Sequence, residues 1–121
     1  AKAIRESFPE AYDAYNKAYR TMGLVLGNIS CAVIKKDDSV IIVVNGVSQQ
    51  FYGKDGKKYV DYSAIETIFE KVNIIADKYQ IKDVHFPMIG AGLGGGDWKI
   101  IEKIIDDTLS NNLNKNLWLL K

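Results

Sequence analysis

A glycine-rich segment in the last third of the chain constrains the fold more than any other feature of the sequence. Five of the ten glycines fall within residues 87–98, which read Pro-Met-Ile-Gly-Ala-Gly-Leu-Gly-Gly-Gly-Asp-Trp. The segment follows a strand-like run, Val84–Phe86, and precedes an amphipathic pattern that predicts a helix from about Asp97. Glycine lets the main chain approach an anion closely, and a helix start offers unpaired N–H groups. The segment therefore predicts a phosphate-holding loop in an α/β protein.

The rest of the chain alternates between strand and helix patterns. Pro9 and Glu10 indicate the start of a helix, and polar residues 36–39 separate two β-branched runs that predict an antiparallel hairpin. Ser63 and Glu66 fit a capping box at the start of a long helix with one apolar face. The predicted strands are residues 29–35, 40–45, 84–89 and 117–120. This order predicts a layered α/β domain with a mixed sheet.

Composition limits the class of protein and its partners. The 121 residues suffice for one domain, which we assign to residues 1–121. A formal net charge of +1 argues against general nucleic-acid binding, so main-chain amides rather than a basic field would recognise phosphate. The single cysteine, Cys31, excludes an intramolecular disulfide and favours a cytoplasmic location. The single histidine excludes a histidine-based metal cluster, no apolar run is long enough to span a membrane, and we expect no cofactor.

Two common phosphate loops fit the glycine segment poorly. Gly90, Gly92 and Gly95 have the dinucleotide-binding spacing, but no acidic residue ends the following strand to hold a ribose. The P-loop spacing fails at Gly96, where a lysine is required. A dinucleotide-dependent oxidoreductase therefore remains a remote alternative. A purely structural turn is another alternative, although five glycines in seven positions cost much chain entropy.

At these residues the sequence resembles a known family, the macro domains. Residues 87–98 are similar to the family's P-x-I-G-x-G-L-x-G-x-x-W stretch. Residues 1–12 resemble the helix after the family's first ligand loop, and residues 52–53 and 59–65 resemble the segment leading into its central helix. The branch that it resembles most contains ADP-ribose 1''-phosphate phosphatases and phage macro domains.

The resemblance implies a three-layer α/β/α macro-domain fold that binds ADP-ribose or an ADP-ribosyl derivative. Its glycine loop would wrap the diphosphate and the distal ribose, and polar residues after the hairpin would contact that ribose. It also implies hydrolysis of ADP-ribose 1''-phosphate or a related ADP-ribosyl ester, with a non-catalytic ADP-ribose reader as the alternative. The implied binding residues are Ile89, Gly90, Ala91, Gly92, Leu93, Gly94, Gly95, Asn45 and Gln49.

The chain also departs from the family pattern. In the family, two strands and a loop containing Asn and Gly precede the stretch matched by Ala1, and one of those strands lies in the middle of the sheet. We therefore expect unpaired main-chain groups in the sheet, and either a longer chain or a partner chain that completes it. One branch removes ADP-ribose from proteins with a Lys nucleophile and a loop Asp. Gln49 and Gly94 stand at those positions, which disfavours that mechanism.

Individual side chains have simpler expected roles. We expect His85 to be a strand histidine paired with a neighbour, although it could also act as an acid or base. Asp97 is expected to cap the last helix, although it could instead help to activate a water. Trp98 is expected to pack that helix onto the sheet. Cys31 is expected to be a buried thiol. The catalytic residues stay unassigned, and Ser48 and Tyr52 are only possible neighbours of the ligand.

Overall fold

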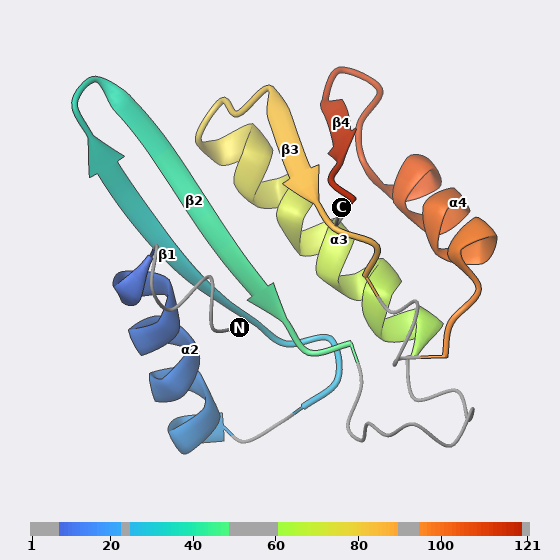
Figure 1. Ribbon diagram of the computed structural model, residues 1–121, viewed down its shortest axis with the longest axis horizontal. Coiled ribbons are helices and arrows are strands. Elements are labelled where there is room, and N and C mark those ends of the chain that lie inside the picture. Colours follow the sequence, from blue (N-terminus) through green and yellow to red (C-terminus); the bar gives the residue numbers. More distant parts are fainter. Residues whose placement is uncertain (1–7, 23–24, 49–60, 90–94, 120–121) are drawn as a thin grey trace.

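The computed structural model describes residues 8–22, 25–48, 61–89 and 95–119. Within these ranges, helices and strands alternate after an opening helix and a hairpin (Figure 1). The predicted α/β class is therefore confirmed. The elements, in chain order, are α2 (Pro9–Met22), β1 (Ile29–Lys36), β2 (Ser39–Gly46), α3 (Tyr62–Lys78), β3 (Asp83–Phe86), α4 (Trp98–Thr108) and β4 (Asn114–Leu117).

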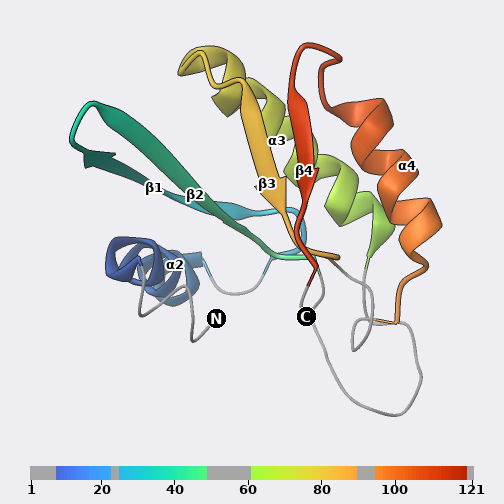
Figure 2. The same cartoon turned by 45° about the horizontal axis from the view of Figure 1, so that its top comes forward.

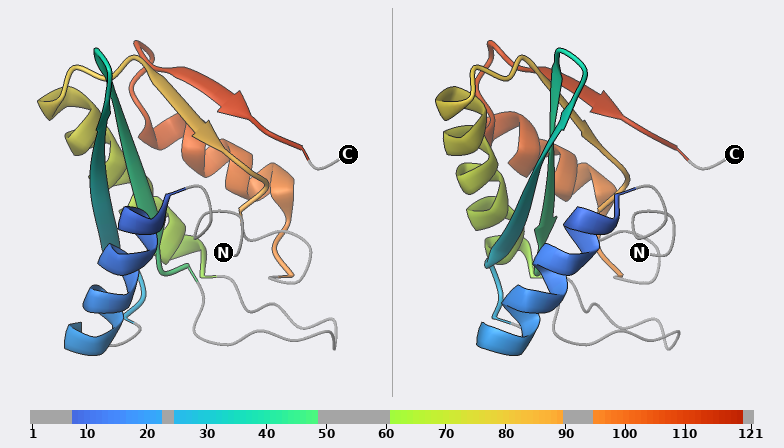
Figure 3. Two further views of the ribbon diagram at one scale, coloured as in Figure 1. Left: turned by 60° about the vertical axis from the view of Figure 1, so that its left-hand side comes forward. Right: turned by 90° about the vertical axis from the view of Figure 1, so that its left-hand side faces the viewer.

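The helices lie on both sides of the strands. Helix α2 covers one face of the β1–β2 hairpin, whereas α3 and α4 lie on the opposite side of the strand layer (Figures 2 and 3). The strands therefore form the middle of three layers. This is the α/β/α arrangement expected from the sequence.

The hairpin forms where the β-branched runs predicted it. Strands β1 and β2 pair antiparallel from Ile29 opposite Gly46 to Lys36 opposite Ser39. Asp37 makes the turn with a positive φ of 56°, a conformation that Asp tolerates better than most residues with a side chain. Both strands extend slightly beyond their predicted ends.

The second strand pair differs from the predicted boundaries. Strand β3 ends at Phe86 rather than at residue 89, because Pro87 has no N–H with which to continue a ladder. Strand β4 spans Asn114–Leu117 rather than residues 117–120, and it pairs parallel to β3. Side-chain amides strengthen this pairing: Asn116 Nδ2 donates to the Val84 carbonyl at 3.3 Å. Asn114 and Asn116 therefore belong to the strand, although asparagine disfavours strands in isolation.

The predicted capping box of α3 is wrong. The residue that caps α3 is Asp61, whose extended main chain (φ −107°, ψ 114°) places its carboxylate 2.8 Å from the Ala64 nitrogen. Ser63 lies inside the first turn of the helix. The carboxylate at position 61 therefore fills the capping role that the pattern assigned to a hydroxyl. The predicted cap of α4 is confirmed, because Asp97 Oδ1 accepts a hydrogen bond from the Lys99 nitrogen at 2.9 Å.

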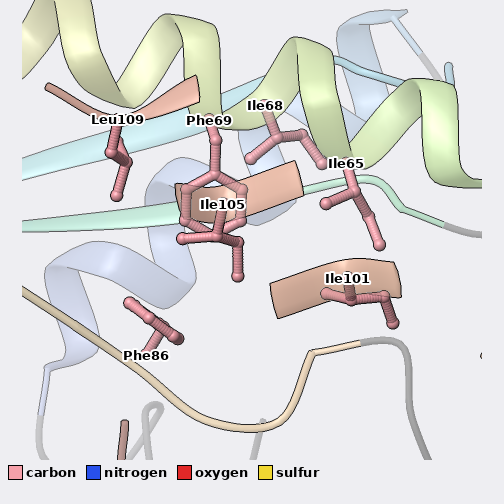
Figure 4. Close-up of a cluster of buried hydrophobic side chains, with 7 residues drawn as sticks. All are labelled: Ile65, Ile68, Phe69, Phe86, Ile101, Ile105 and Leu109. Atoms are coloured by element: carbon pink, nitrogen blue, oxygen red, sulfur yellow. The ribbon is translucent and has the colours of Figure 1, made fainter. Parts of the chain in front are cut away.

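The core lies between α3, α4 and β3. Its three most deeply buried large side chains are Ile65, Ile101 and Ile105. Phe69 meets Phe86 edge to face, with ring centroids 5.9 Å apart. Figure 4 shows the whole cluster of buried side chains, which comprises Ile65, Ile68, Phe69, Phe86, Ile101, Ile105 and Leu109.

Two close approaches fasten the hairpin to α3. A Cβ at Gly46 would lie 2.7 Å from the Ile68 side chain, so only glycine lets the end of β2 approach the helix this closely. At the start of β1, Gly27 has a φ of +86°, and its carbonyl accepts a hydrogen bond from Lys71 Nζ at 2.8 Å. The hairpin therefore rests on α3 at its open end.

The substitution Gly46→Ala tests this contact. We expect it to lower the free energy of unfolding by about 1–3 kcal/mol, because the buried, β-branched Ile68 side chain cannot move aside easily. Urea unfolding of the 121-residue chain measures the change. Ser39→Ala, at the exposed far end of the same strand, is the matched control and should change stability by less than about 0.5 kcal/mol. Equal losses in both variants would contradict the proposed contact.

Candidate functional site

One edge of the strand layer brings together the described ends of the segments that were predicted to form a site. Strands β2, β3 and β4 all end at this edge, and α3 and α4 both begin there (Figures 1 and 2). Ligand sites in α/β proteins form beyond the carboxyl ends of the strands. We call this edge, with residues 45–48, 61–62, 87–89, 95–98 and 118–119, the carboxyl edge.

Hydrogen bonds join the elements that meet at the carboxyl edge. The Asp61 nitrogen donates to the Ser48 carbonyl at 2.7 Å, which ties the start of α3 to the chain that leaves β2. The Asp97 nitrogen donates to the Tyr62 hydroxyl at 3.0 Å, which ties the start of α4 to the start of α3. The two helix N-termini are therefore held in a fixed relation to the end of β2.

The local electrostatics at the carboxyl edge combine two opposing contributions. Each helix N-terminus carries a partial positive charge, which favours an anion nearby. Asp61 and Asp97 already place carboxylates on these N-termini as caps. A bound diphosphate would therefore depend on the main-chain N–H groups of the connecting loop more than on the first turns of the helices.

The two described ends of the glycine segment, residues 87–89 and 95–98, lie at this edge, after β3 and before α4. Gly95, which belongs to this segment, has a φ of +71°, a conformation that residues with a side chain rarely adopt. Ile89 is half-buried and packs against the core, and its nitrogen donates to the Pro87 carbonyl at 2.8 Å. The predicted ligand residues Gly90, Ala91, Gly92, Leu93 and Gly94 lie outside the described residues.

The polar residues predicted after the hairpin have different positions. Asn45 lies within β2, one residue before its end, and stands opposite Ser30 of β1. Ser48 lies beyond the strand, and its carbonyl accepts the hydrogen bond from Asp61. Gln49 and Tyr52 lie outside the described residues.

His85 is paired with a neighbour, as expected from the sequence. Its Nδ1 atom accepts a hydrogen bond from Trp118 Nε1 at 2.8 Å, and the two ring centroids are 5.9 Å apart. A neutral imidazole that accepts at Nδ1 carries its proton on Nε2. His85 is exposed, so this outer nitrogen is available for hydrogen bonding at the surface.

Trp118 is the feature of this edge that the sequence analysis did not identify. It follows the end of β4, its nitrogen donates to the Phe86 carbonyl at 2.9 Å, and its side chain is 64% exposed. Trp98 differs from it: the Trp98 ring packs against the core with its centroid 6.5 Å from that of Phe86, as predicted. A tryptophan directly after the last strand was the available signal, since strand ends gather at one edge.

One open hollow among the described residues lies elsewhere, between α3 and α4. This cavity of about 380 Å³ is lined by Glu66, Glu70, Ile104, Asp107 and Thr108. Three carboxylates in one lining repel a phosphate. The cavity is therefore a poor candidate for a diphosphate site.

The described ranges hold neither a membrane-spanning helix nor a cluster of metal-binding side chains. None of the helices there combines the length and apolar character needed to cross a membrane. Within the same ranges, no three His, Cys, Asp or Glu side chains are grouped to hold a metal ion.

Cys31 is not buried, contrary to the sequence-based expectation. It lies on β1 and is exposed, because α2 covers the opposite face of the hairpin, on which the buried Ala32 lies. Neighbouring protein atoms still remove part of its hydration, and this desolvation raises the pKa of the thiol above its ordinary value of 9.0.

The family can now be identified from the chain as a whole. The family model described as the Macro domain matches residues 1–105, so the chain belongs to the macro domain family. Macro domains generally bind ADP-ribose, and this chain has the three-layer α/β/α fold of the family.

Solved structures support the same fold. A protein of unknown function from Bacteroides thetaiotaomicron is 24% identical, with a TM-score of 0.84 over 98% of this chain and 75% of that one. A macrodomain protein from Streptomyces coelicolor is 25% identical, with a TM-score of 0.71 over 98% and 75% of the two chains. The macrodomain of Mycobacterium tuberculosis DarG is 17% identical, with a TM-score of 0.78 over 98% and 77%. No curated protein matches the chain.

The exposed but desolvated Cys31 thiol makes a testable pH prediction. Below pH 9 the folded chain should hold less thiolate than the unfolded chain, so iodoacetamide should alkylate it completely but more slowly than in urea. The pKa of the Cys31 thiol is higher in the folded chain than in the unfolded chain, so the protonated thiol favours the folded chain. This contribution to stability is complete below the unfolded pKa and disappears as the pH rises through the folded pKa. Mass spectrometry of timed samples measures both rates, with Cys31→Ser as the unlabelled control. Faster alkylation of the folded chain would contradict the shift.

Proposed function

We propose that this macro domain binds ADP-ribose at the carboxyl edge and that the segment from Ile89 to Gly95 holds its diphosphate. The observation that carries the proposal is that this segment joins the end of β3 to the start of α4, and that both of these ends lie at the edge where strands end and helices begin. Main-chain N–H groups in a glycine-rich loop bind phosphate oxygens without a lysine or a metal. The chain's formal net charge of +1 suits such local recognition.

The remaining parts of the ligand would lie along the same edge. Asn45, near the end of β2, and Gln49, which follows β2 in the sequence, are proposed to contact the distal ribose. The exposed Trp118 indole offers a flat surface on the β4 side, with an orientation supported by the 2.8 Å hydrogen bond to His85. Such a surface suits a base or a sugar face. We further propose that polypeptide outside residues 1–121, in the same or a partner chain, forms the opposite wall.

The proposed reaction is hydrolysis of ADP-ribose 1''-phosphate, or of a related ADP-ribosyl ester. Water would add to the phosphorus, and the phosphate would separate from the ribose oxygen, which gains a proton. Main-chain N–H groups would stabilise the developing charge on the phosphate oxygens, and the loop would position the ester. No side chain of the described residues is assigned to the proton transfers. The branch with ADP-ribose 1''-phosphate phosphatases and phage macro domains fits this reaction.

A non-catalytic reader of ADP-ribose is the second candidate. The two carboxylates at the helix starts of the carboxyl edge, Asp61 and Asp97, already serve as caps, which favours a reader because a reader needs only the binding surface. Release of inorganic phosphate from ADP-ribose 1''-phosphate separates the two functions. A dinucleotide-dependent oxidoreductase is a more remote alternative, since β4 leads into Leu117, Trp118 and Leu119 with no acid to hold a ribose.

Several further properties follow from the same proposal. Residues 1–121 would act as a single domain that needs neither a cofactor nor a metal. A cytoplasmic location fits a chain with one unpaired cysteine. ADP-ribose, or a molecule that carries it, would be the principal partner.

Calorimetric titration with ADP-ribose tests the binding proposal. We expect saturable heat at micromolar to millimolar ligand, and Gly92→Val should weaken binding at least about tenfold, or about 1.4 kcal/mol, because its side chain would block approach to the diphosphate. Ser39→Ala, at the opposite edge of the strand layer, is the control and should bind normally. The Trp118 position also predicts that binding changes tryptophan fluorescence, and that Trp118→Phe removes most of this change. No heat at millimolar ligand would overturn the proposal.

A further inference from the structure

His85 and Trp118 lie on the face of the strand layer that is opposite to the core. Side chains alternate along a strand, so the buried Phe86 faces α3 and α4, and its neighbour His85 faces the other way. Asn116 stands opposite His85 in the β3–β4 register, and Trp118, two residues further on, returns to the same face. Strand pairing therefore brings together an imidazole and an indole that are 33 residues apart in the chain.

The hydrogen bond between the two rings can run in one direction only. An indole nitrogen donates but does not accept, so Trp118 Nε1 is the donor and His85 Nδ1 is the acceptor, 2.8 Å apart. An imidazole accepts only while it is neutral, because both of its nitrogens become donors once it is protonated. The observed contact therefore requires the uncharged form of His85.

The orientation of the Trp118 indole depends on this hydrogen bond. The side chain is 64% exposed, so packing restricts it little. The imidazole lies beside it, with the ring centroids 5.9 Å apart and the ring planes inclined by 47°. An exposed side chain loses conformational entropy when it keeps a single rotamer, and a specific contact must offset that loss. In the part of the chain that the structure describes, the hydrogen bond to His85 provides this contact.

The charged surroundings of His85 come from its own strand. Asp83 lies two residues earlier on the same face, and its carboxylate accepts a hydrogen bond from Asn114 Nδ2 at 3.0 Å. On β4, the opposite residue is the neutral Asn116, whereas Lys115 lies on the other face, where it contacts α4. Helix α2, on the same side of the layer, packs against β1 and β2. Among the described residues, Asp83 is therefore the charge that competes with the indole, because a carboxylate favours a protonated imidazole.

We propose that His85 is a positioning residue for the Trp118 indole and that protonation of His85 releases the ring. While the imidazole is neutral, its Nδ1 atom holds the indole in one orientation at the carboxyl edge. When a histidine takes up a proton, between about pH 8 and pH 5, two donors face each other and the contact is lost. One consequence rests on the proposed function: a base or sugar that lies on the indole would bind more weakly at acidic pH.

Two substitutions of the same shape isolate the role of the Nδ1 acceptor. In His85→Asn, the amide oxygen can take the place of Nδ1 and accept the indole N–H at every pH. In His85→Leu, a side chain of the same branching has no acceptor. Position 85 is exposed, so we expect both variants to fold. NMR relaxation of the indole N–H groups in the free 121-residue chain measures how firmly each ring is held.

The expected result is a pH-dependent indole in the unsubstituted chain alone. There, the Trp118 indole should be ordered at about pH 7.5 and mobile at about pH 5.5. It should be ordered at both pH values in His85→Asn and mobile at both in His85→Leu. The Trp98 indole is the internal control, because its ring packs against the core and should stay ordered in every sample.

Calorimetric titration with ADP-ribose at the same two pH values tests the consequence for the ligand. The affinity of the unsubstituted chain should fall about fivefold at the lower pH, which is the effect of losing one hydrogen bond of ordinary strength. The affinity of His85→Asn should be the same at both pH values. Asp83→Asn should keep the pH dependence, because the imidazole and not the neighbouring carboxylate carries it.

The other outcomes contradict the proposal in separate ways. A Trp118 indole that is equally ordered at both pH values in the unsubstituted chain, or equally mobile in the two variants at position 85, would overturn it. An indole that responds to pH while the affinity for ADP-ribose stays constant would overturn its consequence for the ligand. If ADP-ribose bound at neither pH, the proposed function would fail, and the indole of the free chain would still decide the role of His85.

Discussion

The arrangement of this domain depends on the packing of helix α3. The two strand pairs share no main-chain hydrogen bond in the described part of the chain, so side-chain contacts with α3 hold them in one layer. Ile65, Ile68 and Phe69 supply these contacts toward β2, β3 and α4. Fully burying one such side chain contributes about 1.5–3 kcal/mol, so a few residues on one helix face determine the position of both ladders.

The same helix connects the packing to the candidate site. Its N-terminus, capped by Asp61, is bonded to the chain after β2, and Tyr62 is bonded to the start of α4. These hydrogen bonds and the core therefore hold the chain after β2 and the starts of α3 and α4 together. The glycine loop joins β3 to α4, and packing holds both of these elements in place. A loop whose two ends are fixed suits recognition of a ligand by main-chain amides.

The sequence predicted the kinds of elements better than their limits. The β-branched runs identified the hairpin, helical periodicity identified α3 and α4, and Asp97 was correctly assigned as a cap. The cap of α3 was missed because Asp61 and Ser63 both fit local capping rules, and only the main-chain conformation separates them. Strand β4 was misplaced because asparagine disfavours strands in isolation, whereas here its side chains bond to β3. For the site, the sequence indicated the glycine loop, but the meeting of Trp118 and His85 depends on long-range strand pairing.

The central claim is that the carboxyl edge of this domain binds ADP-ribose. Two-dimensional amide NMR with added ADP-ribose tests it most directly. The account predicts saturable shifts at Ser48, Gly95, Asp97 and the Trp118 indole, and unchanged signals at the opposite edge, at Ser39, Gln80 and Asn111. Shifts confined to that opposite edge or to the acidic cavity between α3 and α4, or no shifts at millimolar ligand, would contradict it.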